Sequence, residues 1–424
     1  MHRPMRRFLV VASLAVACLV LVIVANPGER SRHGLEPRPP ASQVANHARS
    51  TTLATAAAPI AANAAITLPL GYEQPMALAT DPSEPGVWFL SASMTDVSVF
   101  FWNAVSANLT HYSLGAPSTH GLEFGTEASL AVGPSGTVWV GANSTLARLD
   151  VATGSITYLA VPTPPDNSNA EAPRPPPLQG SHLIQALAAS DSGDVAIAMS
   201  ASSAVLVYSD SAQTFSTISL NDDAEPLDVA YAPDGVLGVA TANWAQGGQT
   251  NLLQFVQADG TISTATADSL TVSPFSSGTE QGFASTGGGA TVDLTIPAAE
   301  SGNSPTTPTV SPTTLPGGPI VFTDPISELP DGKMLAATNT GFAVIDGPTG
   351  SSAQYQLPSI SCLNASSAEP DPSASSAETG APAPEPDTCQ EHPIRSVTDL
   401  DGNVWFTSSV SSNSISEVQA SEFN

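Results

Sequence analysis

The chain has 424 residues, of which 41% are hydrophobic, so it is long enough to bury a large core within one all-β domain. Its formal net charge is −27, because 38 Asp and Glu residues outnumber only 11 Lys and Arg residues. Seven of these cations lie in residues 1–49 beside two acids, a net charge of +5, and the remainder holds 4 cations and 36 acids, a net charge of −32. Such an acidic body repels phosphate backbones and anionic lipid surfaces, which argues against nucleic-acid binding.

The first 25 residues have the character of a targeting segment. Residues 1–7 are basic, and residues 8–25 (FLVVASLAVACLVLVIVA) form an uncharged apolar run of 18 residues. That length is at the lower limit for a membrane-spanning helix and exceeds the usual core of a signal peptide. We expect a signal anchor, a single transmembrane helix that leaves the folded body outside the cell membrane. The alternative is a cleaved signal peptide and a secreted protein, although Ile23 fits a cleavage site after Ala25 poorly.

Low-complexity segments follow at four places. Residues 26–64 are rich in Pro, Ala, Ser and Arg, and we expect them to form a disordered tether. Similar tracts near 162–178, 297–319 and 363–388 interrupt the rest of the chain, but the alternating hydrophobic pattern resumes after each one. They are therefore interpreted as disordered insertions in one domain, 65–424.

Two cysteines, Cys362 and Cys389, enclose the last of these insertions. A disulfide between them would close the loop at its base, which requires an oxidising compartment. The alternative is a pair of free thiols, because no C-x-x-C pattern accompanies them to indicate a zinc site.

One pattern recurs along the body of the chain. An alternating apolar run leads through a Gly-containing turn into a strongly apolar strand, and two further strands follow after a Ser-, Thr- or Asn-rich loop. Six clear copies begin at Met76, Ala128, Ile184, Leu227, Ile326 and Ile394, and a weaker copy occupies residues 268–296.

Four strands in a repeat of about 40 residues are typical of a β-propeller blade. We therefore predict an all-β fold, a seven-bladed β-propeller of four-stranded antiparallel blades, or six blades if the weak copy is not one. A β-sandwich is the alternative, but it gives no reason for the turn to recur at blade spacing. The last copy holds only three strands, and residues 65–71 (AITLPLG) precede the first copy as an isolated strand. We predict that this strand pairs with residues 415–418 and closes the ring, which hides both sheet edges.

The turn Asp401-Gly402 leads into the apolar triplet Val404-Trp405-Phe406. We predict that the turn joins the first and second strands of a blade and that the triplet fills the space between neighbouring blades. Trp88, Trp139 and Leu237 are predicted to hold the place of Trp405 in other copies.

The repeats "SGTVWVGANSTLARLDVATGSITYLAV" and "DGNVWFTSS", followed by "NSISEV", resemble those of the streptogramin B lyase (virginiamycin B lyase) family. The resemblance covers most of residues 65–420 and implies a seven-bladed propeller. It further implies an elimination reaction that opens a cyclic peptide lactone, with a His base, Glu side chains and Mg²⁺ at the central mouth. One departure is Ser408, which stands where the family's repeats carry a glutamate.

Polar residues at the starts of the innermost strands are the candidate site residues. If the blades close into a ring, these side chains meet at one end of the central channel, where a carboxylate ring could bind a cation and a neutral His could act as a base. The candidates for catalysis are His392, His182 and Glu225. The candidates for binding are Glu73, Glu127, Asp228, Asp324 and Arg395. No metal ligand set can be assigned, and no cofactor is established; Mg²⁺ is implied only if the chain is lyase-like.

The function expected from these features is a membrane-tethered, extracytoplasmic binding module, monomeric, for a small ligand or an envelope protein. The alternative is an Mg-dependent carbon-oxygen lyase of the streptogramin B lyase type, acting on a cyclic peptide or another small molecule. A structural platform that makes contacts through its Pro-rich insertions is a third hypothesis.

Overall fold

The computed structural model describes residues 58–59, 61–73, 75–116, 128–164, 182–221, 224–243, 250–266, 270–277, 280–286, 291–297, 308–315, 326–346, 351–361, 388–390, 393–408 and 414–423. Every described residue belongs to one compact unit, Leu53–Asn424. The predicted signal anchor at 1–25 lies outside the described residues. Within the described ranges, no helix has the length and apolar character needed to cross a membrane.

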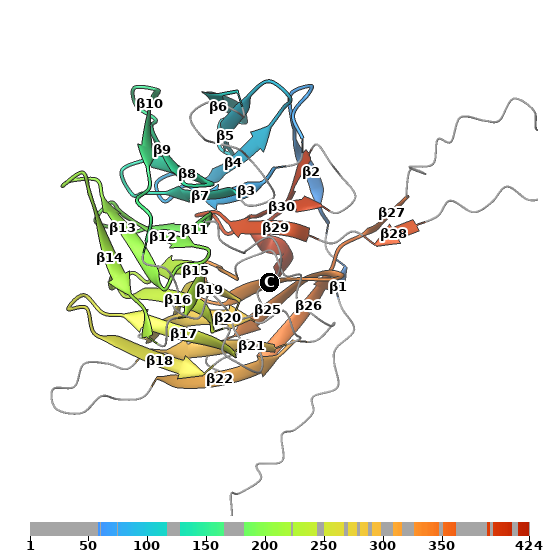
Figure 1. Ribbon diagram of the computed structural model, residues 1–424. Coiled ribbons are helices and arrows are strands. Elements are labelled where there is room, and N and C mark those ends of the chain that lie inside the picture. The colour runs from blue at the N-terminus through green and yellow to red at the C-terminus, as the bar shows by residue number, and fades with distance from the viewer. Residues whose placement is uncertain are drawn as a thin grey trace, which may run out of the picture. The chain divides into compact units, whose positions relative to one another are not determined.

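Seven four-stranded antiparallel sheets form a ring, which confirms the predicted seven-bladed β-propeller (Figure 1). Blade 1 contains β3 (Ala77–Thr80), β4 (Gly86–Ala92), β5 (Val97–Asn103) and β6 (Asn108–Gly115). Blade 2 contains β7 (Ala128–Val132), β8 (Thr137–Ala142), β9 (Thr145–Asp150) and β10 (Ser155–Ala160). Blade 3 contains β11 (Ile184–Ala189), β12 (Asp194–Met199), β13 (Ala204–Ser209) and β14 (Thr214–Ser219). Blade 4 contains β15 (Glu225–Tyr231), β16 (Leu237–Asn243), β17 (Thr250–Val256) and β18 (Ile262–Thr266).

The remaining three blades include two strands, β22 and β1, that lie in segments predicted from the sequence to be disordered. Blade 5 contains β19 (Thr271–Ser277), β20 (Glu280–Thr286), β21 (Thr291–Ile296) and β22 (Thr309–Thr314). Blade 6 contains β23 (Ser327–Glu328), β24 (Met334–Thr338), β25 (Gly341–Asp346) and β26 (Ser351–Gln356), with β1 (Ala58–Pro59) added in parallel at its outer edge. Blade 7 contains β29 (Pro393–Thr398), β30 (Val404–Ser408), β31 (Ser414–Val418) and β2 (Asn63–Thr67), and a 3₁₀ helix, η3 (Ala420–Phe423), follows β31.

Two segments expected to be disordered therefore contribute strands. The weak copy at 268–296 is a true blade, but its fourth strand, β22, lies within the tract 297–319. Likewise β1 belongs to the predicted tether, yet it pairs with β26. Pro within β22 conceals its strand character in the sequence, because Pro is uncommon in strands. It is tolerated here because β22 is an outer edge strand, where one side of the ladder has no partner to bond.

The ring closes as predicted, by a strand from each end of the body. β2 pairs antiparallel with β31, and Ile66 lies opposite Ile415. Ile66 is 3% exposed and packs in the cluster that joins blades 7 and 1. The N-terminal strand therefore supplies the outer strand of the last blade and leaves no open seam.

Hydrophobic clusters fill the interfaces between neighbouring blades. Trp88, Trp139 and Trp405 are each 1% exposed, which confirms that these aromatic residues belong to the core. The prediction for Leu237 needs correction, because ladder register places Gly238 at the position of Trp405. A Cβ on Gly238 would lie 2.5 Å from the ring of Phe283, so blade 5 supplies the aromatic side chain that blade 4 lacks.

In two blades, a buried aspartate bonds to the turn that precedes the tryptophan. Asp399 Oδ1 accepts the backbone N–H groups of Asp401 and Asn403, at 3.0 and 2.9 Å, while its Oδ2 accepts Trp405 Nε1–H at 2.8 Å. Asp81 and Trp88 repeat the indole bond at 2.8 Å in blade 1. Aspartate satisfies the turn because its short side chain reaches backbone groups two residues further on.

A two-stranded ladder lies at the base of the last insertion. β27 (Ser359–Ser361) pairs with β28 (Thr388–Gln390), and Ile360 lies opposite Cys389. Cys362 lies outside the described residues, so the disulfide stays a prediction.

Candidate functional site in the central channel

The innermost strand of each blade lies toward the axis of the ring, hereafter the channel (Figure 1). A cavity of about 500 Å³ in this channel is lined by residues of β3, β7, β11, β15, β19 and β29. Its size lies in the range of small-molecule sites. The candidate site is therefore this cavity and not the rim alone.

Ladder register identifies the side chains that lie at one level of the channel. Val397 lies opposite Trp405, and Arg395 precedes Val397 by two residues on the same face of β29. In blades 1 to 4, we likewise take the residue that lies opposite the position equivalent to Trp405 and step back two residues along the innermost strand. This gives Ala77, Ser129, Ala186 and Asp228.

A repeated hydrogen bond between blades extends this layer to blade 5. Ser129 Oγ accepts the Leu187 N–H from the next blade at 2.8 Å, and Asp228 Oδ2 accepts the Val272 N–H from the next blade at 2.8 Å. Thr271, which precedes Val272, therefore lies at the same level. All six residues of this layer, hereafter the channel layer, line the cavity: Ala77, Ser129, Ala186, Asp228, Thr271 and Arg395.

The channel layer combines free space with two opposite charges. Alanines and a serine in blades 1 to 3 leave the volume that larger side chains would fill. Asp228 belongs to blade 4 and Arg395 to blade 7, three steps apart in a ring of seven, so the two charges approach from nearly opposite sides.

β-Bulges present these side chains to the channel. Register shifts occur between Pro226 and Asp228 in β15, and between Pro393 and Arg395 in β29. A third shift precedes Ala186 in β11. Because a bulge inserts one residue, it reverses which positions face inward and re-aims the next side chain.

Asp228 is a half-buried carboxylate whose hydrogen bonds come from backbone N–H groups. Its Oδ1 accepts the Val229 N–H at 2.9 Å, in addition to the Val272 N–H on Oδ2. Burial raises its pKa to about 6, although these two hydrogen bonds act in the opposite direction. No cation among the described residues forms an ion pair with it, and Arg395, the other charge of the channel layer, belongs to a blade on the far side of the ring.

Further polar groups surround this charge. Thr271 Oγ1 is buried and has no hydrogen-bond partner within the described part of the chain. Tyr231 also lines the cavity, and burial, with a smaller effect of Asp194, raises its pKa to about 12, so the phenol stays protonated and can donate a hydrogen bond. An unsatisfied buried hydroxyl in a polar cavity indicates a bound water or ligand group.

Two of the predicted catalytic residues meet at one peptide group instead of in the cavity. Glu225 is fully buried, and its Oε1 accepts the Ala201 N–H at 2.8 Å. His182 Nδ1 lies 3.3 Å from the Ser200 carbonyl oxygen, on the other side of the same peptide unit. Ala201 adopts a φ of 57°, so Glu225 bonds to a strained turn of the preceding blade.

The other predicted residues divide between described and undescribed parts of the chain. Glu73 is exposed, and its backbone N–H and carbonyl bond to Ala92 and Ser91. His392, Glu127 and Asp324 lie outside the described residues. Among the described residues, no group of three or more His, Cys, Asp or Glu side chains could hold a metal ion.

Sequence reasoning identified Asp228 and Arg395 but did not distinguish them from the polar residues at the strand starts. It missed Thr271 and Tyr231, whose role depends on which face of a strand points inward. The one available signal was the shared Pro-x-charged spacing in "EPLD" and "HPIR", which coincides with the bulges.

Comparison of the sequence with protein-family models and with curated proteins gives no match. Solved structures do match in fold. A streptogramin B lyase structure is 13% identical, with a TM-score of 0.54, and the match covers 83% of this chain and 95% of that chain. Virginiamycin B lyase from Staphylococcus aureus, in a catalytically inactive form with quinupristin, is 12% identical, with a TM-score of 0.55 and coverage of 84% and 97%.

A protein of another kind matches equally broadly. The WD40 β-propeller domain of Doa1 is 12% identical, with a TM-score of 0.51, and the match covers 86% of this chain and 99% of that chain. The fold is therefore similar to that of both a lyase and a WD40 domain. The comparisons therefore show the fold alone, and the fold does not by itself select an activity.

Proposed function

We propose that the chain is an extracytoplasmic binding module, tethered to the membrane by its N-terminal segment, whose channel binds a small ligand carrying both an ammonium group and a carboxylate. The observation that carries the proposal is the channel layer, with one carboxylate and one guanidinium on nearly opposite sides of a cavity of about 500 Å³.

Each end of such a ligand satisfies a different need of the channel. A buried charge is stable when it is paired, and a ligand ammonium would pair with Asp228 and donate a hydrogen bond to the Thr271 hydroxyl oxygen. Arg395 offers planar donors that match a carboxylate.

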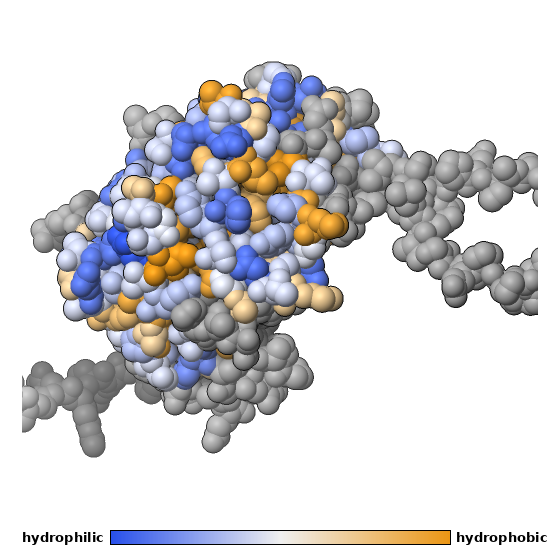
Figure 2. Space-filling model, turned by 90° about the horizontal axis from the view of Figure 1, so that it is seen from above, coloured by the Kyte–Doolittle hydropathy of each residue, from blue (hydrophilic) through white to orange (hydrophobic). Residues whose placement is uncertain are grey.

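The one face of the molecule that Figure 2 shows also favours binding within the channel. In the face shown in Figure 2, hydrophobic residues form several separate groups among hydrophilic ones. A broad protein interface would instead be expected to expose a continuous apolar patch.

The first test is isothermal titration calorimetry at pH 7.5 with glycine, β-alanine, γ-aminobutyrate and glycylglycine. These probes place an ammonium and a carboxylate at different separations, and methylamine and acetate carry one charge each. At least one amphoteric probe should bind, and Asp228→Asn and Arg395→Gln should each weaken it about ten-fold or more, as expected when one partner of a buried charge pair is lost.

Asp259→Asn is the matched control, because Asp259 is an exposed acid in the turn between β17 and β18. It should leave the affinity unchanged. The proposal fails if no amphoteric probe binds at about 10 mM, a concentration that detects even weak sites. It also fails if methylamine or acetate binds as well as the best amphoteric probe.

The lyase alternative rests on likeness of fold and repeat, and no contact among the described residues favours it over binding. Purified protein incubated with a streptogramin B antibiotic, with and without Mg²⁺, tests it directly. Mg²⁺-dependent opening of the ring that His392→Ala abolishes would establish the lyase and displace the binding proposal as the main function.

Membrane tethering has its own test. Fractionation of cells that express the full chain should recover the protein at full length with the membranes. A shortened species in the culture supernatant would instead identify the N-terminal segment as a cleaved signal peptide.

A further inference from the structure

A second cavity, of about 430 Å³, lies between the outer strands of blades 2 and 3 and shares no residue with the channel. Blade 2 supplies residues from β9 and β10, and blade 3 supplies residues from β13, β14 and the turn between them. We call this cavity the inter-blade groove. It is lined by Arg148, Thr157, Leu159, Tyr208, Asp210, Gln213 and Phe215.

An aromatic row leads from the core to this groove. The rings of Trp139 and Tyr208 lie 5.5 Å apart, and those of Tyr208 and Phe215 lie 4.9 Å apart. Trp139 and Tyr208 are buried, whereas Phe215 is half-buried at the outer end of the row. The groove therefore has an apolar, ring-lined side.

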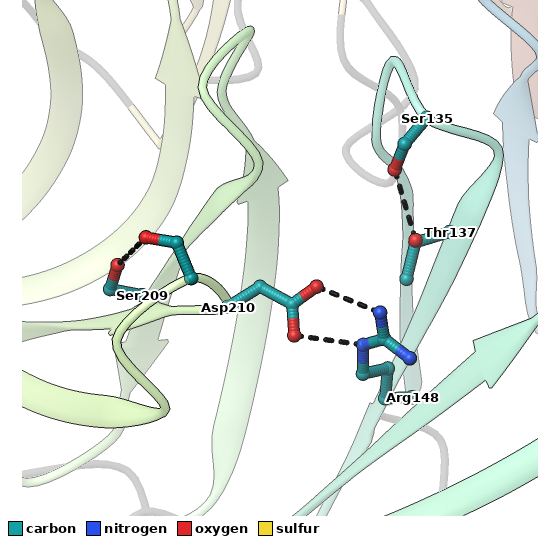
Figure 3. A network of polar contacts seen from close by, with 6 residues as sticks. Ser135, Thr137, Arg148, Ser209 and Asp210 are labelled. Carbon is teal, nitrogen blue, oxygen red and sulfur yellow. Dashed lines mark hydrogen bonds and ion pairs between the residues drawn. The ribbon is translucent and has the colours of Figure 1, made fainter.

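A fixed pair of charged groups spans the groove. Arg148 donates from Nε and Nη2 to the two carboxylate oxygens of Asp210, at 2.9 and 2.8 Å (Figure 3). The guanidinium also lies 5.7 Å from the centroid of the Trp139 ring. These contacts fix both planar groups, and the hydrogen bonds to Asp210 raise the pKa of Arg148. Within the described part of the chain no other charged residue lines the groove, so the charges of Arg148 and Asp210 cancel there.

Blade 1 shows how the same position is filled when only packing is needed. Phe101 lies opposite Trp88 as Arg148 lies opposite Trp139, and the Phe101 ring stacks on Trp88 at 4.5 Å. In blade 2 an arginine replaces this aromatic filler. One of the four cations of the acidic body thus occupies a position that a hydrophobic side chain fills elsewhere.

We propose that the inter-blade groove binds a neutral saccharide. A sugar ring has an apolar C–H face that packs against aromatic rings, and its hydroxyl groups both donate and accept hydrogen bonds. The paired Arg148 and Asp210 present donors and acceptors in fixed positions, and Thr157 and Gln213 add uncharged polar groups. Anions are repelled by the acidic body, and cations meet a carboxylate that is already neutralised.

The test uses three neutral probes, cellotriose, maltotriose and N,N′,N″-triacetylchitotriose, with the full chain. Binding is measured by saturation-transfer difference NMR and by the change in tryptophan fluorescence. At least one probe should bind, and Phe215→Ala should weaken it about five-fold or more, because the stacking surface is lost.

Two further variants keep the test independent of folding and of the channel. Gln213 is exposed and has a φ of 53°, so Gln213→Gly removes its side chain without backbone strain and should also weaken binding. Asp228→Asn should leave saccharide binding unchanged. The proposal is overturned if no probe binds at about 20 mM, a limit that includes weak sites. It is also overturned if Phe215→Ala and Gln213→Gly bind like the wild type, or if Asp228→Asn abolishes binding.

Discussion

Asp228 shows how one residue can connect structure, pH and ligand. Its carboxylate holds blades 4 and 5 together by accepting the Val272 N–H, yet it lies in a channel where its charge is poorly solvated. The same burial that raises its pKa makes it a favourable partner for a cation. A residue that only tied the two blades together could be a neutral serine, as Ser129 is between blades 2 and 3.

This placement makes stability depend on pH. An acid whose pKa is higher in the folded state is protonated in both states at low pH, so the folded state pays a penalty only when the acid ionises. The free energy of unfolding should therefore fall as the pH rises from about 4 to about 6, by at most about 3 kcal/mol, and channel water should lessen this. Urea unfolding between pH 4 and pH 8 measures the effect.

Asp228→Asn is the reference for that measurement, because other carboxylates also contribute to the pH profile. The stability of the wild type relative to the variant should fall across this range and level off above about pH 6. Parallel pH profiles for the two proteins would show that Asp228 does not titrate as the structure indicates.

Among the structural elements, the turn between β29 and β30 both reverses the chain and anchors the buried core. Asp399 is 3% exposed and bonds to both the turn backbone and the buried indole of Trp405. Gly402 in the same turn has a φ of 82° and lies against Pro330 of blade 6, so the turn also packs on its neighbour.

Asp399→Ala should lower the free energy of unfolding by about 2–4 kcal/mol, because it leaves the Trp405 N–H and two turn N–H groups without their acceptor. Chemical unfolding followed by tryptophan fluorescence measures this loss. Asp401→Ala changes the same residue type two positions later, at an exposed side chain, and should change stability by less than about 0.5 kcal/mol. Equal losses in both variants would contradict the role given to Asp399.

The sequence predicts this element well because its information is local. Asp401-Gly402 marks the turn and Val404-Trp405-Phe406 marks a buried strand, so the hairpin follows from neighbouring residues. Gly238 is different, since its missing side chain is explained only by Phe283 of the next blade. The strand β22 was hidden for a similar reason, because its partner β21 and not its own composition determines its pairing.

The candidate site lay further from prediction than the fold. Counting alternate residues from the start of a strand assumes an unbroken ladder, and the bulges before Asp228 and Arg395 change which face each later residue occupies. Glu225 looked equivalent to these residues in the sequence, yet it lies before the bulge and is buried against Ala201. The sequence shows which of these residues are polar, but it does not show which of their side chains face the channel.

At the scale of the whole molecule, stability depends on the ladder between β2 and β31. Ile66→Asp would place an unpaired charge in the cluster between blades 7 and 1, and should lower the free energy of unfolding by about 4 kcal/mol or more. Thr67→Asp is the matched control, because Thr67 is exposed on the same strand and its replacement should have little effect. Urea unfolding of both variants measures these changes. If Ile66→Asp lowers the free energy of unfolding no more than Thr67→Asp does, the closing strand contributes little to stability.

The closing pair also sets an order of events during synthesis. Ile66 leaves the ribosome long before Ile415, its partner 349 residues later (415 minus 66). At typical bacterial and eukaryotic elongation rates this interval is roughly 20–70 s. During that time β2 has no β31 to pair with, so the apolar side chain of Ile66 reaches its place between blades 7 and 1 only after blade 7 has emerged.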